Sequence, residues 1–303
     1  MAKFQDIKRN PSEFLSMTGY TLDEFNALLP WFVESLAESK YTLEGKERQN
    51  KATIYSNSPL PMPEDKLFFI LVYVKQYPTQ TMLGATFGIP QPKANQWIHF
   101  LTPILQSALS KSGESPCRNM DEFSPQDFNV FAHDGTERPI QRPVDNAEQK
   151  EYYSGKQKRH TVKNNVLANA ICKVVYLTAT VEGKKHDKKL ADESEYKLPK
   201  GSVLLQDTGF QGFSVEGVFI VQPKKKPRGG ELNKEEKDAN REISRLRVRI
   251  EHVINGVKRY RIVKDKCRNW AKGFKDRIME IACGLHNFRL NFRPWKPMEA
   301  PTG

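Results

Sequence analysis

The sequence lacks several features that mark common protein classes. No apolar run reaches the roughly 18–20 residues that a membrane-spanning helix needs. The N-terminus, MAKFQDIKRNP, has no apolar core of a secretory signal. The four cysteines are scattered and form no CxxC pair, which argues against a zinc site or a disulfide framework: Cys117, Cys172, Cys267 and Cys283. We therefore expect a soluble, cytoplasmic protein with no membrane partner.

The net charge of +12 is concentrated in the second part of the chain. Residues 1–120 carry 12 Lys/Arg and 11 Asp/Glu, a balance of +1, whereas residues 121–303 carry 36 and 25, a balance of +11. Because a basic surface attracts phosphate groups, this distribution favours a polyanionic partner for the second part of the chain.

The N-terminal part is predicted to be helical. Residues 12–40 follow a helical stripe, and Thr21 and Glu24 have the spacing of a capping box. Pro30 is expected to break or bend this run, because proline lacks the backbone N–H that a helix interior uses. Residues 41–63 are polar and proline-rich, which is typical of a linker.

Three apolar helices are predicted from Glu64 to about residue 110. The turn Gly88-Ile89-Pro90 between the second and third resembles the turn of a helix-turn-helix. The start of the third helix would then reach base edges of DNA through polar side chains: Gln91, Lys93, Asn95 and Gln96. A plain three-helix bundle is the alternative.

Strands and helices alternate after a polar connector at residues 111–126. The predicted strands are Phe128–His133, Thr161–Ala168, Ile171–Thr180, Ser202–Gln206 and Phe219–Val221. The predicted helices are Asp187–Ala191, Lys234–Tyr260 and Gly273–Phe292. This order favours an α/β fold in which helices cover a mixed sheet.

Three acidic residues occupy positions that suit a divalent-metal nuclease. Asp134 and Asp207 each end an apolar, β-branched run, and Glu251 lies on the flank of an amphipathic helix. Open α/β sheets place their chemistry at the carboxyl ends of strands. Three carboxylates there can hold two Mg²⁺ ions, which activate a water or hydroxyl and stabilise a phosphodiester transition state.

The Glu-bearing helix has one apolar stripe, formed by Ile243, Leu246, Ile250, Val253, Ile254 and Val257. Arg247 and Lys258 share the flank of this stripe with Glu251. Both cations are therefore expected to bind phosphates beside the scissile bond without competing for metal. The other arginines of the helix, Arg249 among them, are expected to face solvent.

Two further segments are rich in cations. Tyr152 and Tyr153 precede Lys156, Lys158, Arg159 and Lys163, a combination suited to a DNA backbone or a flipped base. Lys224, Lys225, Lys226 and Arg228 predict a phosphate-contacting loop beside the active site. Solvated loops are the alternative for the first segment. Asp187 is interpreted as a helix N-cap in preference to a metal ligand, and His133 and His252 as structural residues.

Six segments together resemble one protein family: HDGTERPIQRP (133–143), YYSGKQKRHTVKNN (152–165), HDKKLAD (186–192), LLQDTGFQG (204–212), PKKKPRG (223–229) and NREISRLRVRIEHVINGVKRYRI (240–262). The chain is similar to bacterial insertion-sequence transposases of the DDE superfamily, in the group related to harbinger elements. The match covers about residues 64–290. Ser244 replaces the usual tyrosine three residues before the arginine of the signature. The resemblance implies an RNase H-like core with Asp134, Asp207 and Glu251 as its metal-binding triad.

The resemblance also implies a function. A transposase would bind the terminal inverted repeats of its element, cleave each end with two Mg²⁺ ions, for which Mn²⁺ can substitute, and join the ends to target DNA. It would act on double-stranded DNA as a dimer or higher oligomer, associated with the bacterial nucleoid. The expected division is a helical segment and linker (1–63), a helix-turn-helix region and connector (64–126) and a catalytic domain with a C-terminal helix (127–303). A domesticated, non-catalytic DNA-binding protein and an endonuclease without strand transfer are the alternatives.

Overall fold

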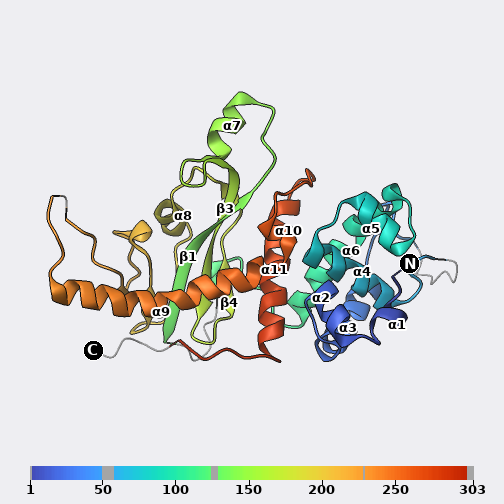
Figure 1. Ribbon diagram of the computed structural model, residues 1–303, viewed down its shortest axis with the longest axis horizontal. Coiled ribbons are helices and arrows are strands. Elements are labelled where there is room, and N and C mark those ends of the chain that lie inside the picture. Colours follow the sequence, from blue (N-terminus) through green and yellow to red (C-terminus); the bar gives the residue numbers. More distant parts are fainter. Residues whose placement is uncertain (1, 50–57, 124–128, 228, 299–303) are drawn as a thin grey trace. The chain divides into compact units, whose positions relative to one another are not determined.

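The computed structural model describes residues 2–49, 58–123, 129–227 and 229–298, and the chain divides into two compact units (Figure 1). The helical unit comprises Met1–Ser115, Val257–Asp265 and Asn269–Phe292. The sheet unit comprises Pro116–Gly256, Lys266–Arg268 and Arg293–Gly303. Within the described ranges, none of the helices combines the length and the apolar character needed to span a membrane.

The helical unit is built around α4, in which every residue from Leu67 to Val74 is buried. Stacked and edge-on aromatic rings of Phe4, Phe14, Phe25 and Phe68 join the first helices to α4. The described helices of this unit are α1 (Phe4–Ile7), α2 (Pro11–Thr18), α3 (Leu22–Ala37), α4 (Pro63–Gln76), α5 (Gln80–Phe87), α6 (Gln91–Lys111), α10 (Arg261–Lys264) and α11 (Phe274–Leu290). Helix α11 packs against α6 and so belongs to this unit, although it was predicted to be part of the catalytic segment.

The predicted capping box is confirmed at the start of α3, where Thr21 and Glu24 exchange hydrogen bonds with each other's backbone N–H. The expected helix over residues 12–40 is two helices, because Gly19 adopts the left-handed conformation and ends α2. Pro30 does not break α3. Phe25, Leu28 and Phe32 are fully buried on both sides of the proline, and their packing keeps the helix continuous.

Helices α5 and α6 form the predicted helix-turn-helix. Gly88 ends α5 in the left-handed conformation, and the backbone N–H of Ile89 donates to the Gly84 carbonyl at 2.9 Å. A Cβ atom on Gly84 would lie 2.4 Å from the carbonyl oxygen of Ile89. The tight turn therefore needs glycine at two positions, one for its backbone conformation and one for close approach.

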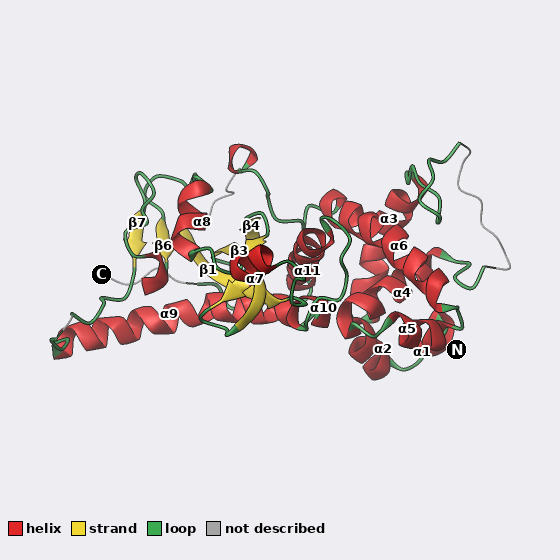
Figure 2. Cartoon of the chain, turned by 90° about the horizontal axis from the view of Figure 1, so that it is seen from above, coloured by secondary structure: helices red, strands yellow, loops and turns green. Residues whose placement is uncertain are grey.

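Within the described residues, the sheet unit is a mixed seven-stranded sheet with the order β2-β3-β1-β6-β7, to which β4 and β5 add on β3. Figure 2 shows β1, β3, β4, β6 and β7 of this sheet. Its strands are β1 (Val130–Pro139), β2 (Tyr153–Ser154), β3 (Arg159–Asn169), β4 (Val174–Leu177), β5 (Val181–Glu182), β6 (Val203–Leu205) and β7 (Phe219–Val221). Strand β1 pairs antiparallel with β3 and parallel with β6, which pairs parallel with β7. This is the mixed sheet expected of an RNase H-like core.

Helices α7 (Asn146–Tyr152), α8 (Asp187–Glu193) and α9 (Lys234–Lys258) accompany the sheet, and short 3-10 helices span Met120–Glu122 and Thr208–Phe210. The sequence predicted α8 and α9 but missed α7, β2, β5 and α10. Helix α7 has no buried residue and therefore no apolar stripe, and the other three are too short to show a clear period. Phe128, the predicted start of the first strand, lies outside the described residues. Residues of α9 up to Gly256 belong to the sheet unit and the last two to the helical unit.

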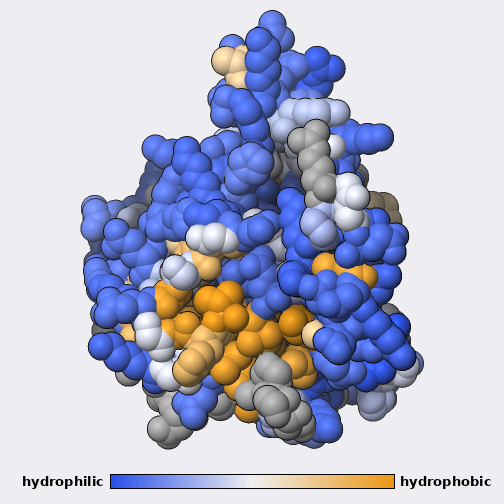
Figure 3. Space-filling view, turned by 90° about the vertical axis from the view of Figure 1, so that its left-hand side faces the viewer, coloured by the Kyte–Doolittle hydropathy of each residue, from blue (hydrophilic) through white to orange (hydrophobic). Residues whose placement is uncertain are grey.

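A cluster of buried aromatic and aliphatic side chains lies under the sheet, and Phe131, Leu204 and Phe210 are its central members. His133 lies within it, 3.9 Å from the ring centre of Phe210, with Nε2 3.1 Å from the Gln206 amide oxygen. Burial lowers the pKa of His133 to about 3, so this histidine is neutral and structural, as predicted. Figure 3 shows that apolar side chains also gather on the surface at the β6–β7 end of the sheet unit.

The Gly84 contact generates a stability prediction. We expect Gly84→Ala to destabilise the helical unit by about 1–3 kcal/mol, because the new Cβ overlaps a backbone carbonyl that cannot move alone. Urea unfolding followed by tryptophan fluorescence measures this change. Gly155→Ala is the control, since no atom lies within 4 Å of a Cβ placed there. Equal midpoints for the two variants would contradict the steric argument.

Candidate active site

The parallel pairing of β1 with β6 brings two aspartates to one edge of the sheet. This pairing joins Val130–Ala132 to Val203–Leu205, and Asp134 and Asp207 each lie two residues beyond its end. On its other side β1 continues past Asp134, which pairs with Val166 of β3. Asp134 was expected to end its strand. This is wrong for the pairing of β1 with β3, which continues past Asp134, and it holds only for the pairing of β1 with β6. The end of the β1–β6 pairing is what brings the two aspartates to one edge of the sheet.

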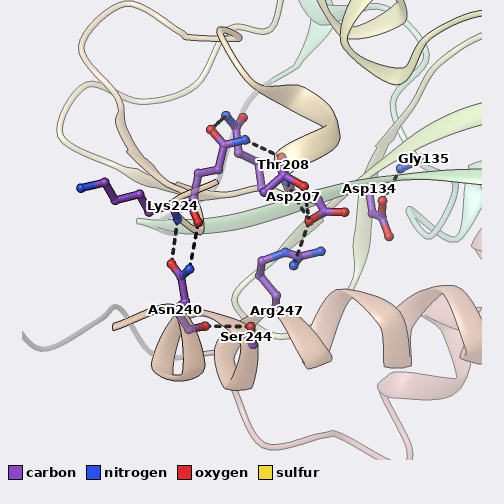
Figure 4. A network of polar contacts seen from close by, with 10 residues as sticks. Asp134, Gly135, Asp207, Thr208, Lys224, Asn240, Ser244 and Arg247 are labelled. Carbon is purple, nitrogen blue, oxygen red and sulfur yellow. Dashed lines mark hydrogen bonds and ion pairs between the residues drawn. The ribbon is translucent and has the colours of Figure 1, made fainter. Parts of the chain in front are cut away.

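Arg247 of α9 points from the helix toward this edge (Figure 4). Its Nη1 lies 3.1 Å from Oδ1 of Asp207, and its side chain is only 13% exposed, compared with 41% for Asp207. The same Asp207 oxygen accepts a hydrogen bond of 2.7 Å from the backbone N–H of Thr208. Arg247 was expected to bind phosphate without competing for metal. In the structure its guanidinium already neutralises Asp207, one of the two aspartates.

The pKa of Asp134 is shifted by its burial and by four neighbouring groups. Burial is the main reason that the pKa of Asp134 is raised to about 6, and the nearby carboxylates of Asp187 and Asp207 raise it further. The backbone N–H of Gly135, 2.7 Å from its Oδ1, and the charge of Arg247 oppose this rise. Arg247 is thus an electrostatic partner of both aspartates.

A third carboxylate lies at the same edge. Asp187 is the first residue of α8, and the N-cap position belongs to His186, so the N-cap prediction is wrong. A Cβ atom on Gly135 would lie 2.4 Å from Oδ1 of Asp187. A Cβ atom on Gly209 would lie 3.9 Å from Oδ2 of the same residue. Gly135, which follows Asp134, thus leaves room for Asp187 to approach the site.

Lys163 neutralises the carboxylate of Asp187. Its Nζ lies 3.0 Å from Oδ1 of Asp187 and 3.6 Å from Oε1 of Glu137, and it donates to the Lys185 carbonyl at 2.8 Å. The side chain is only 8% exposed. The prediction that Lys163 binds DNA is therefore wrong for this structure, because its ammonium group is enclosed by its partners.

The apolar stripe of α9 is confirmed, with Ile250, Val253, Ile254 and Val257 buried and Ile243 and Leu246 half-buried. Glu251 is exposed and lies one turn beyond Arg247, and His252 is exposed beside it. Arg249 was predicted to face solvent but is half-buried beside Cys172, whose thiol interacts with it. The geometry brings Asp134, Asp207 and Arg247 together. The role of Glu251 as the third member of the triad stays a prediction.

A polar network fastens the first half of α9 to the loop after β7 (Figure 4). The Asn240 side chain accepts from the Lys224 N–H at 2.7 Å and donates to the Lys224 carbonyl at 2.9 Å. The Gln222 amide in turn donates to the carbonyl of Asp207 at 2.7 Å. This network fixes α9 relative to Asp207, a feature that the sequence did not reveal because single Asn and Gln residues carry no periodic signal.

The predicted DNA-contacting residues lie on several surfaces. In the helix-turn-helix, Gln80 hydrogen-bonds to both Gln91 and Asn95, Lys93 lies 3.4 Å from Glu44, and Gln96 is half-buried. In the sheet unit, Lys156, Lys158 and Arg159 are exposed in the turn between β2 and β3, and Lys225 is exposed. Lys224 pairs with Glu236, Lys226 lies 3.7 Å from Glu231, and Lys258 is half-buried. Arg228 lies outside the described residues.

The donor chemistry at the edge fits a hard divalent cation, which prefers carboxylate oxygens. The guanidinium of Arg247 is a stand-in for such a charge, since it lies against Asp207 and stabilises the ionised form of Asp134. In the described part of the chain, no group of three or more acidic, histidine or cysteine side chains is arranged to hold a metal ion. The structure brings the carboxylates of Asp134 and Asp207 to this edge, where such a cation would find oxygen donors.

The raised pKa of Asp134 predicts a cost in stability. Between the ordinary pKa near 4 and the folded value of about 6, the folded chain binds more protons than the unfolded chain, so the free energy of unfolding falls as pH rises through this window. We expect Asp134→Asn to stabilise the metal-free protein by about 1–3 kcal/mol at about pH 8, and much less at about pH 4. Urea unfolding at the two pH values measures this, with the exposed Asp192→Asn as control. Equal effects of Asp134→Asn at both would contradict it.

Comparison with known proteins agrees with this geometry. The family described as DDE superfamily endonuclease matches residues 133–287, and the helix-turn-helix of DDE superfamily endonuclease matches residues 58–111. The chain is 28% identical over 280 residues to a probable transposase for insertion sequence element IS702 of Microchaete diplosiphon, covering 92% of this chain and 94% of the relative. It is 25% identical over 246 residues to a putative transposase for insertion sequence element IS112 of Streptomyces albus G, covering 80% and 87%.

No solved structure matches the chain significantly. The endonuclease match begins at His133, next to Asp134, and extends through β6 and α9, so it contains every residue of the edge described above. It covers more than half of the sequence, and the helix-turn-helix match adds the DNA-binding fold of the same superfamily. The chain therefore belongs to the DDE superfamily of endonucleases.

Proposed function

We propose that the protein is the transposase of an insertion sequence, which binds the terminal inverted repeats of its element, cleaves a strand at each end and transfers the ends to target DNA. The observation that carries the proposal is the pair Asp134 and Asp207 at one sheet edge. Arg247, which belongs to the same helix as Glu251, reaches this pair from α9. The similarity to two insertion-sequence transposases over most of the chain supports it.

Asp134, Asp207 and Glu251 would hold two Mg²⁺ ions. Bound Mg²⁺, or Mn²⁺ in its place, supplies Lewis acidity that activates a water or a 3′-hydroxyl and stabilises charge on the phosphodiester. Asp134 has to be ionised to act as a ligand, so cleavage should weaken as the pH falls below about 6. Lys163 keeps Asp187 neutralised, which limits the negative charge that the site has to accommodate.

Arg247 has two roles in this proposal. Without DNA it holds Asp207 and lowers repulsion between the two aspartates. With DNA bound it donates to a phosphate beside the scissile bond, because the planar guanidinium forms paired hydrogen bonds with phosphate as readily as with carboxylate. Lys258, farther along the same helix, supplies a second cation to the DNA backbone.

Recognition and assembly complete the proposal. The helix-turn-helix selects the inverted repeats through Gln91, Lys93, Asn95 and Gln96, while the basic residues of the sheet unit bind DNA phosphates with less dependence on sequence. Two element ends have to be joined in one reaction, so a dimer or higher oligomer is expected. The reaction takes place on DNA in the bacterial cytoplasm, at the nucleoid.

Substitution of the triad tests the chemistry. We expect Asp134→Asn, Asp207→Asn and Glu251→Gln each to lower Mg²⁺-dependent cleavage of element-end DNA by about 10³-fold or more while DNA binding persists, because each removes a charged ligand. Glu242→Gln is the matched control, since Glu242 is an exposed acid of the same helix that pairs with Arg245. Mn²⁺ binding followed by electron paramagnetic resonance gives a readout that does not depend on cleavage.

Full cleavage by purified Asp134→Asn protein would overturn the assignment of the site. Cleavage without joining of the ends to target DNA would show an endonuclease in place of a transposase. Specific binding without cleavage by the natural protein would show the non-catalytic alternative. Each outcome is read from the same labelled DNA on a sequencing gel.

The recognition helix is tested separately. Gln91→Ala and Lys93→Ala lie at the start of α6, so each should lower the preference for inverted repeats over random duplex by about tenfold, the value of one lost base contact. Ser110→Ala, exposed near the other end of the same helix, is the control. Gel-shift competition measures the preference. An unchanged preference in both variants would show that α6 does not read base edges.

A further inference from the structure

A cavity lies beside α7, where β1 and β3 extend beyond the active-site edge. Six residues line this open space of about 670 Å³: Arg142, Asn146, Gln149, Lys150, Tyr153 and His160. Its volume falls within the range of small-molecule sites. Figure 1 shows α7 at the far end of the ribbon that β1 and β3 form, within the sheet unit. The cavity is thus separate from the site of Asp134 and Asp207.

The lining of the cavity is cationic. Arg142 and Lys150 contribute positive charge, and among the residues that the structure describes no acidic side chain lines the cavity. Among the nearby acids, Asp145 accepts from the backbone at the start of α7, Glu151 pairs with Lys184 at 3.3 Å, and Glu148 is exposed on α7. The exposed cations Lys156, Lys158 and Arg159 follow in the adjoining turn and at the start of β3. An anion would therefore find more cations than acids here.

Gln149 holds Arg142 in a fixed orientation. The amide oxygen of Gln149 accepts from both Nε and Nη2 of Arg142, at 2.9 and 2.6 Å. Its amide nitrogen donates to the carbonyls of Pro143 and Val144. Because Gln149 is neutral, the guanidinium is oriented without losing its charge, and its remaining N–H groups are available to a phosphate.

The cavity also has an aromatic wall. The rings of Tyr153 and His160 meet edge to face with their centres 5.7 Å apart, and Tyr153 is 45% exposed. An aromatic ring held in place by a neighbour, with part of its surface open, is suited to stacking on a nucleobase. A base inside a paired duplex cannot reach such a ring, whereas an unpaired or extruded base can.

The strands fix the distance from this cavity to the active site. His160 lies six residues before Val166, the β3 partner of Asp134. At about 3.3 Å per residue, the cavity is roughly 20 Å from Asp134 along the ribbon. This distance corresponds to about six base pairs of duplex DNA. DNA held at the active site can therefore also reach the cavity.

We propose that this cavity binds one unpaired nucleotide of the DNA substrate, with its base stacked on Tyr153 and its phosphate held by Arg142 and Lys150. The inference rests on the proposed function, because it takes DNA as the substrate. It adds a subsite that captures a distorted or extruded nucleotide near the cleaved end. The site then favours DNA that is locally unpaired over perfect duplex.

Binding of the full chain to two DNA probes tests this proposal. One probe is a short duplex with a single unpaired 2-aminopurine, and the other is the same duplex fully paired, both in buffer without divalent metal. The natural protein should bind the bulged probe more tightly and quench its 2-aminopurine fluorescence. Tyr153→Ala should reduce that preference by about tenfold, whereas Tyr153→Phe, which keeps the ring, should retain it. Arg142→Ala should also weaken binding of the bulged probe.

Phe219→Ala is the matched control, because Phe219 is a similarly exposed aromatic of the same unit on β7. An equal loss for both probes in Tyr153→Ala would show only a backbone contact, and no loss for either probe would show a solvated surface; both results overturn the inference. Loss of the preference in Tyr153→Phe would overturn the stacking arrangement. A natural protein that binds neither probe nor element-end DNA would instead contradict the proposed function.

Discussion

Repulsion between carboxylates at one sheet edge is the constraint on which the rest of the structure depends. Asp134, Asp207 and Asp187 approach each other because β1, β6 and α8 converge there, and partly buried like charges are unfavourable unless cations compensate them. The fold supplies two such cations from distant parts of the chain, Arg247 and Lys163. The ion pairs of Arg247 on α9 and of the buried Lys163, together with the glycine after Asp134, agree with this constraint.

The compensation is incomplete, and this has a functional meaning. Asp134 keeps a raised pKa despite Arg247, so the site is less stable as a charged cluster than a fully paired one. A site of this kind gains most from a divalent cation, since the cation offsets the burial of the Asp134 charge, which is the main cause of the raised pKa, and the smaller repulsion by Asp187 and Asp207. The unfavourable free energy of such a charged site has to be offset by packing elsewhere. The aromatic cluster around His133, Phe131 and Phe210 supplies such packing on the same strands.

The two units divide the work of a DNA-processing enzyme in a way that their chemistry explains. The helical unit buries aromatic rings and presents a short turn that glycines make possible, so it is a rigid frame for α6. The sheet unit holds Asp134 on β1 and Asp207 just after β6, and it extends β1 and β3 into a ribbon with exposed cations at its end. A long strand pair is a rigid support, because hydrogen bonds continue on β3 from the active site to the turn before Arg159.

The sequence by itself determined the local elements and the family. Period 3.6 in α9, the capping box of Thr21 and Glu24, and the Gly88 turn are local signals, and the segments around Asp134, Asp207 and Glu251 carried the resemblance to DDE transposases. Only the tertiary structure decided which distant side chains meet. It placed Arg247 on Asp207, Asp187 against Gly135 and Lys163 in an enclosed ion pair, and it turned Arg249 toward Cys172. Periodicity fixes which face of an element is buried, but the partner of a charged side chain depends on strand register and helix placement, which are set by contacts far apart in the chain.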